Sequence, residues 1–161
     1  MKNYIIAIDQ STSATKAILF DEGCKLLGRV NVEHKQYYPQ AGWVEHDAEE
    51  IYQNAVEAIR RLMAQGLTEA DASFSLAITN QRETAVVWNV KTGKPIAHAV
   101  VWQCQRGAEI CRQLKEAGHE KTFLKKSGLL IGPYFSASGV KWILDHVEGA
   151  REAAERGELR M

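Results

Sequence analysis

The sequence predicts an α/β fold with a mixed sheet. Three strand-like runs, at residues 4–8, 17–20 and 25–32, follow one another with short turns between them, which is typical of an antiparallel meander. Apolar residues then recur at helical spacing after Asp47, and a strand-like run and several helical segments follow from Leu76 onward. Strands and helices interleaved in this way indicate the α/β class.

The first helix has clear start and stop signals. Asp47 is a preferred N-cap residue, and Glu50 stands three residues later in the capping-box position. Gly66 is the predicted end. The later elements are expected as a strand at 76–79, a hairpin of 85–90 and 96–102 around the turn 91–95, helices at 108–117, 119–126 and 136–147, and a helical C-terminal stretch at 148–161.

The composition of the chain argues against several classes of protein. The chain has 161 residues, enough for one domain with a core, and carries 20 basic and 20 acidic side chains. Zero net charge argues against a nucleic-acid binder, and no apolar run approaches the roughly 18–20 residues that span a bilayer. The three cysteines contain no Cys-x-x-Cys pair, so we expect reduced thiols in a cytoplasmic protein rather than disulfides or zinc.

The first turn, residues 9–16, is rich in hydroxyl groups. Ser11, Thr12, Ser13 and Thr15 offer hydroxyls, and successive backbone N–H groups in a tight turn form an anion-binding nest. Lys16 adds a positive charge for a phosphate, and Asp9 is placed to hold a water bound to Mg²⁺. The alternative is a plain hairpin turn whose hydroxyls bond to their own backbone.

A second polar stretch, Asn80–Thr84, interrupts two segments that look buried. Arg82 and Glu83 together supply donors and an acceptor suited to a small polyol, and Trp102 and Tyr134 are candidates for the wall of such a pocket. A structural ion pair or a solvated turn is the alternative for the charged residues. Core packing is the alternative for the aromatic residues.

Several motifs, taken together, resemble the N-terminal part of the glycerol kinases, a branch of the FGGY carbohydrate-kinase family. They are Asp9-Gln10-x-Thr12, YPQAGWVEHD (38–47), ITNQRET (78–84), TGKPI (92–96), VVWQC (100–104), Pro133-Tyr134-Phe135 and VKWILDHVEGAREAAERGEL (140–159). The resemblance covers nearly the whole chain. It implies an actin/hexokinase-like ATPase fold (ribonuclease H-like), with ATP and Mg²⁺ as cofactors and glycerol or a similar polyol as substrate.

The resemblance also implies roles for individual residues. Arg82, Glu83 and Tyr134 would bind glycerol hydroxyls, Trp102 would cover the glycerol carbons, and Thr12 would also contribute to the substrate site. Nucleotide phosphates would lie against Thr12, Ser13, Ala14 and Lys16. Some positions depart from the family pattern: Ser11 replaces Gly, Lys16 replaces Arg, Gly107 replaces Thr, Gly132 replaces an acidic or polar residue, and Ser138-Gly139 replaces Thr-Lys.

The family enzymes are several times longer than this chain. We therefore expect residues 1–161 to be an N-terminal kinase domain without its C-terminal partner, with the catalytic base outside this segment and the segment alone inactive. The sequence does not decide whether the full-length protein forms a homo-oligomer. Two alternatives also remain: another FGGY sugar or polyol kinase, and a non-catalytic binding domain derived from a kinase.

Overall fold

The computed structural model describes residues 2–161, which form two compact units. The first unit comprises Glu49–Arg82 and the described residues up to Lys35. The second comprises Gln36–Ala48 and Glu83–Met161. The boundary at Arg82 and Glu83 therefore falls inside the polar stretch that the sequence singled out.

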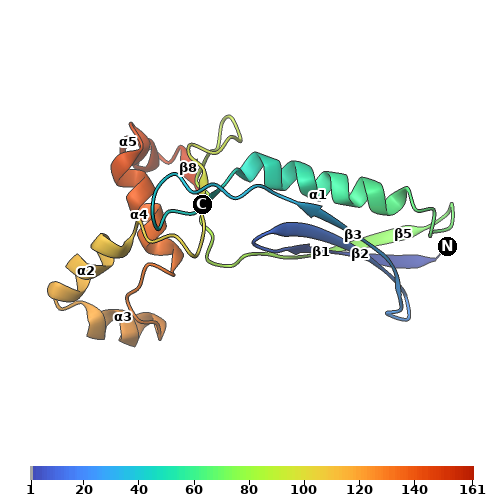
Figure 1. Ribbon diagram of the computed structural model, residues 1–161, viewed down its shortest axis with the longest axis horizontal. Helices are drawn as coiled ribbons and strands as arrows, with labels where there is room; N and C mark the ends of the chain where they lie inside the picture. Colours follow the sequence, from blue (N-terminus) through green and yellow to red (C-terminus); the bar gives the residue numbers. More distant parts are fainter. Residues whose placement is uncertain (1) are drawn as a thin grey trace. The chain divides into compact units, whose positions relative to one another are not determined.

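The first unit is built on a four-stranded sheet (Figure 1). The strands β1 (Asn3–Gln10), β2 (Ala14–Asp21) and β3 (Leu26–Glu33) form the predicted antiparallel meander. The strand β5 (Ser73–Thr79) pairs parallel to β1, so the sheet is mixed, in the order β3-β2-β1-β5. These strands confirm the predicted arrangement.

The first turn is shorter than the sequence suggested. The strands β1 and β2 leave only residues 11–13 between them, and Asp9 and Lys16 are paired strand residues. Thr15 is fully buried, and its hydroxyl donates to Oε1 of Gln10 at 3.0 Å. The expectation that Thr15 offers a hydroxyl to a ligand was therefore wrong, because β2 begins at Ala14, three residues before the predicted run at 17–20, and the Thr15 side chain is buried.

Helix α1 (Ala48–Met63) covers one face of this sheet (Figure 1). It begins directly after Asp47, as predicted, and its fully buried Ala58 and Leu62 pack with Ile6 and Leu19. Burial of such apolar side chains away from water is the main stabilising contribution to this unit.

The strand β5 leaves apolar side chains exposed. Phe74, Leu76 and Ile78 are paired in register with Tyr4, Ile6 and Ile8 of β1, so both rows lie on the same face of the sheet. The β1 row is buried, whereas Phe74, Leu76 and Ile78 are 41%, 59% and 68% exposed. The edge strand β5 contains no charged residue and no proline to discourage further pairing.

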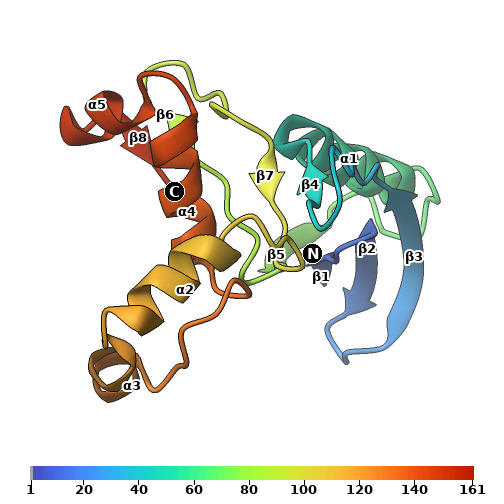
Figure 2. The same ribbon diagram turned by 60° about the vertical axis from the view of Figure 1, so that its left-hand side comes forward.

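The second unit joins short strand pairs to four helices (Figure 2). The strands β4 (Glu45–His46) and β7 (Ala99–Val100) pair antiparallel, as do β6 (Trp88–Asn89) and β8 (Leu159–Arg160). The helices are α2 (Ala108–Glu116), α3 (Glu120–Ser127), α4 (Ser136–His146) and α5 (Ala150–Glu155). Their core contains Val87, Val100, Cys104, Ile143 and Leu159.

The predicted hairpin at 85–102 is only partly correct. The two segments run antiparallel, with bridges from Ala85 to Val100 and from Trp88 to Pro95. The regular strands are shorter than predicted and pair with β8 and β4 instead of with each other. Pro95 has no N–H to donate, which limits a continuous ladder beside the turn.

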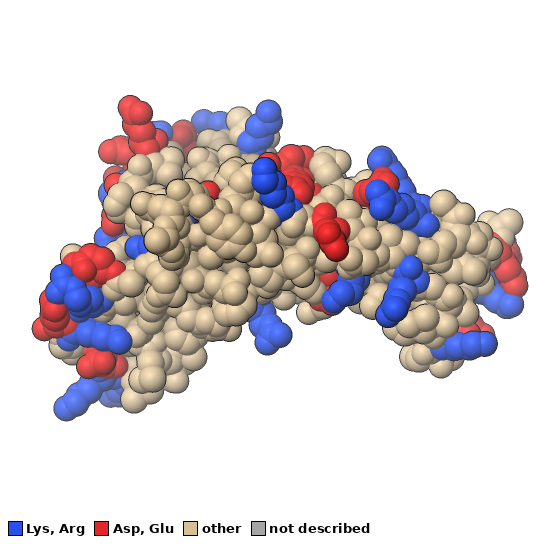
Figure 3. Space-filling view, in the orientation of Figure 1, with Lys and Arg blue, Asp and Glu red and all other residues tan. Residues whose placement is uncertain are grey.

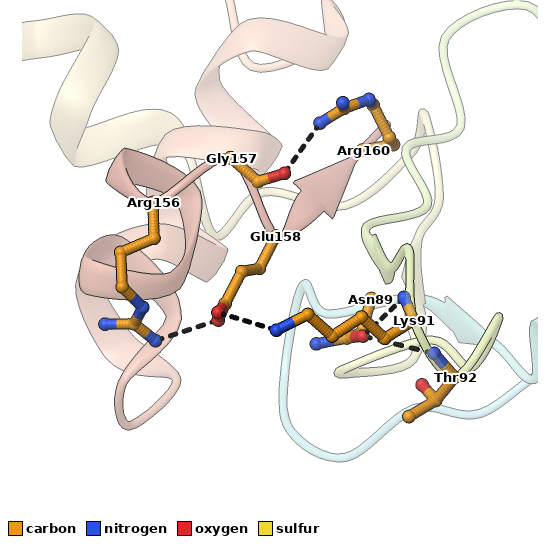
Figure 4. A network of polar contacts seen from close by, with 7 residues as sticks. All are labelled: Asn89, Lys91, Thr92, Arg156, Gly157, Glu158 and Arg160. Atoms are coloured by element: carbon orange, nitrogen blue, oxygen red, sulfur yellow. Dashed lines mark hydrogen bonds and ion pairs between the residues drawn. The ribbon is translucent and has the colours of Figure 1, made fainter.

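The C-terminal stretch also differs from the prediction of a continuous helix. Helix α5 stops at Glu155, and Gly157 adopts a φ of 71°, which lets the chain turn into β8. The carboxylate of Glu158 then accepts from Arg156 at 2.9 Å and from Lys91 at 3.2 Å (Figure 4). This network ties the C-terminal segment to the turn that follows β6.

Charged side chains of both signs are interspersed on the face drawn in Figure 3. This mixture agrees with the equal numbers of acidic and basic residues in the sequence. Among residues 2–161, none of the helices combines the length and the apolar character needed to cross a bilayer.

Close packing between α2 and α4 predicts the effect of one substitution. A Cβ atom at Gly107 would lie 2.4 Å from the Ser138 hydroxyl oxygen and 2.6 Å from its Cβ. We therefore expect Gly107→Ala to destabilise the protein by about 1–3 kcal/mol, the usual cost of overpacking. Chemical denaturation measures this change. Gly132→Ala is the control, because a Cβ there meets nothing within 4 Å, and equal stability losses in both variants would contradict the packing argument.

The exposed row on β5 predicts self-association of the 161-residue chain. Uncharged edge strands with an apolar face pair readily with other chains. Leu76→Lys should shift sedimentation toward the monomer, whereas Leu26→Lys on β3, at a residue that is also about half exposed, should not. If the wild type sediments as a monomer at high concentration, β5 is not an association edge.

Candidate functional site

The hairpin between β1 and β2 carries the residues predicted to bind phosphate. Lys16 Nζ lies 2.9 Å from Asp9 Oδ2 and 3.3 Å from the Ser11 hydroxyl oxygen. The hydrogen bond from Lys16 lowers the pKa of Asp9 from its usual value, and a hydrogen bond from Ser11 adds to this shift, while burial opposes it. Asp9 is therefore an ionised carboxylate with an ammonium group beside it.

The backbone of this turn is anchored on β3 and His34. The buried His34 ring has its Nε2 2.8 Å from the Thr12 carbonyl oxygen, and because a carbonyl only accepts, Nε2 carries the proton. The His34 backbone N–H donates to the Ser13 carbonyl at 3.2 Å. In a trans peptide the N–H points opposite to the C=O. The N–H groups of Ser13 and Ala14 therefore point away from His34.

Arg82 has an unusual backbone conformation. Its φ is 40°, in the left-handed region that residues other than glycine seldom adopt. The side chain is exposed, and it makes no hydrogen bond or ion pair with residues 2–161. Strained residues of this kind are concentrated at functional sites. The alternative of a structural Arg82–Glu83 ion pair therefore has no support in the described residues.

Glu83 is half-buried and contacts the start of helix α4. Its Oε2 accepts from the Ser136 backbone N–H at 3.1 Å and from the Ser136 hydroxyl at 2.8 Å. The same hydroxyl also lies 3.2 Å from the Glu83 carbonyl oxygen. Glu83 is thus held by a single residue, Ser136, that lies 53 positions later in the chain.

Two of the predicted aromatic residues meet in the same unit. The rings of Trp102 and Tyr134 have centroids 5.8 Å apart and an interplanar angle of 67°, an edge-to-face arrangement. Tyr134 is 49% exposed, so it is not a core residue, and Trp102 is half-buried. Tyr134 lies two residues before Ser136, which binds Glu83. A carboxylate, an indole and a phenol are therefore tied to one local framework.

A buried arginine supports the turn that carries Trp102. The Arg106 guanidinium donates to Glu45 Oε1 at 2.6 Å and to the Cys104 sulfur at 3.0 Å. It lies 4.0 Å from the centroid of Trp43 and 4.6 Å from that of Trp142. These contacts fix the residues that follow Trp102.

The structure thus divides the predicted site residues between the units. Asp9, Thr12, Ser13, Ala14 and Lys16 lie on the first hairpin, and Arg82 ends that unit, whereas Glu83, Trp102 and Tyr134 belong to the second unit. The sequence did not predict the supporting contacts made by Ser136 and His34. Only the position of Ser136 at the start of a predicted helix, beside Tyr134, was available as a signal.

The chemistry of these groups is specific. A carboxylate with one oxygen held in place, in the same unit as two aromatic rings that contact each other, suits hydroxyl groups on a short carbon chain. Among residues 2–161 there is no cluster of three or more His, Cys, Asp or Glu side chains arranged for a metal ion. The single carboxylate of Asp9 does fit Mg²⁺, which commonly uses one or two carboxylates together with waters and substrate phosphates.

Known proteins match this chain closely. It is 53% identical over 156 residues to glycerol kinase 1 of Thermotoga maritima and 50% identical over 159 residues to glycerol kinase of Staphylococcus haemolyticus, covering 97% and 99% of this chain. The chain spans 32% of the length of each of these relatives.

The chain is also similar to a solved structure of a glycerol kinase. The crystal structure of Plasmodium falciparum glycerol kinase with ADP matches 98% of this chain and 32% of its own, with a TM-score of 0.92 and 30% identity. The likeness confirms the predicted actin/hexokinase-like fold.

The sequence model of the N-terminal domain of the FGGY carbohydrate kinases matches residues 4–159. The predicted resemblance is therefore confirmed over nearly the whole chain. The chain belongs to the FGGY family of carbohydrate kinases.

Proposed function

We propose that this chain supplies the polyol site and part of the phosphate loop of a kinase that transfers phosphate from ATP to glycerol, forming sn-glycerol 3-phosphate. The observation that carries the proposal is the grouping of Glu83, Trp102 and Tyr134 on one framework in a chain about 50% identical to glycerol kinases. Because the chain spans about a third of those relatives, the activity belongs to a longer polypeptide that also provides the catalytic base.

In this proposal each polyol-binding residue has one task. Glu83 accepts a hydrogen bond from a hydroxyl group, and Arg82 and Tyr134 donate to hydroxyl oxygens. The face of Trp102 covers the carbon chain and excludes water from it. Arg82 is free to turn toward a ligand because no carboxylate of residues 2–161 holds its guanidinium.

The hairpin between β1 and β2 serves the nucleotide. The N–H groups of Ser13 and Ala14 and the hydroxyl of Thr12 line the phosphates, and Lys16 contributes positive charge. Thr12 is also assigned to the substrate, as the family resemblance implies. Asp9 would hold Mg²⁺ through a water, and the ion when bound neutralises charge on the transferred phosphoryl group. Catalysis of such a transfer depends on positioning and electrostatic stabilisation.

Glycerol binding tests the proposal directly. Calorimetric titration of the full-length protein should detect glycerol binding, and Arg82→Ala should weaken it by about tenfold or more, since a hydrogen bond to a charged group contributes about 1.5–3 kcal/mol. Arg61→Ala is the control, because among residues 2–161 the exposed Arg61 side chain pairs with Glu57 of the same helix and with no other residue.

Two results would contradict the proposal. Equal affinities of the wild type and Arg82→Ala would remove Arg82 from the site. Tighter binding of a ketose such as D-xylulose than of glycerol would assign the chain to another sugar kinase of the family.

A further inference from the structure

The contact between Glu83 and Ser136 is unusually complete for two residues so far apart in the chain. Ser136 uses both its backbone N–H and its hydroxyl on Oε2 of Glu83, at 3.1 and 2.8 Å. Hydrogen bonds to a carboxylate are shorter and stronger than those between neutral groups. Two donors from one residue also fix the direction of the carboxylate plane.

Helix α4 provides a second reason for the carboxylate to stay there. Phe135, at the N-cap position, has no side-chain hydrogen bond to the helix. The first N–H groups of a helix need acceptors, and the N-terminus attracts negative charge. Glu83 supplies the acceptor that Phe135 cannot. The carboxylate is therefore held by the helix end as well as by the Ser136 hydroxyl.

The two oxygens of Glu83 have different surroundings. Every hydrogen bond that the carboxylate receives from residues 2–161 ends on Oε2. Oε1 therefore keeps its full capacity to accept. With Oε2 fixed, rotation of the carboxylate about its own axis is restricted, and Oε1 points in one direction.

Resting on the proposed function, we infer that Ser136 is a positioning residue of the polyol site: it binds Oε2 of Glu83 and so presents Oε1 to a hydroxyl group of the substrate. The side chain acts through Glu83 and does not itself contact the ligand. It also joins the Arg82–Glu83 segment to Tyr134, two residues before it, so that the acceptor and the phenol keep a constant spacing.

The inference predicts a selective loss of affinity. Ser136→Ala removes the hydroxyl donor and keeps the backbone donor, so the carboxylate gains freedom. We expect the dissociation constant for glycerol, measured by calorimetry on the full-length protein, to rise about tenfold, the loss expected when a hydrogen bond to a charged group is removed. Ser136→Thr keeps the hydroxyl and should restore affinity to within about threefold of the wild type.

The helix offers a matched control. The Ser138 hydroxyl donates to the Phe135 carbonyl at 3.2 Å and does not touch Glu83. Ser138→Ala should therefore leave glycerol affinity unchanged. Thermal unfolding of all three variants separates positioning from folding, because a purely structural role of Ser136 would lower the melting temperature without the selective loss and the rescue by threonine.

The outcomes distinguish this inference from the proposed function. If the wild type binds glycerol and Ser136→Ala binds it equally well, the positioning role is wrong and the polyol site stands. If Ser136→Ala and Ser136→Thr weaken glycerol binding equally, the Ser136 hydroxyl does not orient Glu83, and the positioning role is again wrong. If the wild type does not bind glycerol at all, the proposed function fails, and the inference fails with it.

Discussion

The second unit depends on satisfying one buried charge. The Arg106 side chain is 3% exposed, and a guanidinium so far from water requires partners on all sides. Glu45 provides the carboxylate, and Trp43 and Trp142 provide aromatic faces. Removing one partner of such a pair typically costs about 3–5 kcal/mol. This constraint fixes β4 against the turn that carries Trp102.

The same principle explains why polar residues interrupt the apolar segments at 80–84. Glu83 is placed where a helix end and a serine hydroxyl satisfy one of its oxygens. Arg82 is placed in the left-handed region with no partner among residues 2–161. One charge is held in position and the other has no partner among the described residues, so the two do not form a structural ion pair with each other.

Local patterns in the sequence predicted most of the regular elements. The meander, helix α1 and the helices from α2 to α4 were predicted because their apolar periodicity and their glycine stops are local signals. The partners of β6 and β7 were not predicted, because pairing with β8 and β4 depends on segments distant in the chain. Thr15 was misplaced for a similar reason, since the length of β2 is set by pairing with β3.

The residue types of the candidate site were proposed from the sequence, whereas the contacts that hold them in place were not. Motifs identified Glu83, Trp102 and Tyr134, and the structure adds the edge-to-face contact of the two rings. Neither Ser136 nor His34 belongs to a pattern that names a chemical role, and both act through contacts with residues more than 20 positions away. The departures from the family pattern at Gly107 and Ser138 also have a structural explanation, because these two positions pack against each other.

The most direct measurement is the two-dimensional ¹H–¹⁵N NMR spectrum of the full-length protein during a glycerol titration. The account predicts that the Trp102 indole and Tyr134 amide signals shift together, and that the indoles of Trp43 and Trp142, which pack on Arg106, do not. Shifts confined to other residues, or no saturable shift at all, would contradict the claim that the polar break after β5 is part of a polyol site.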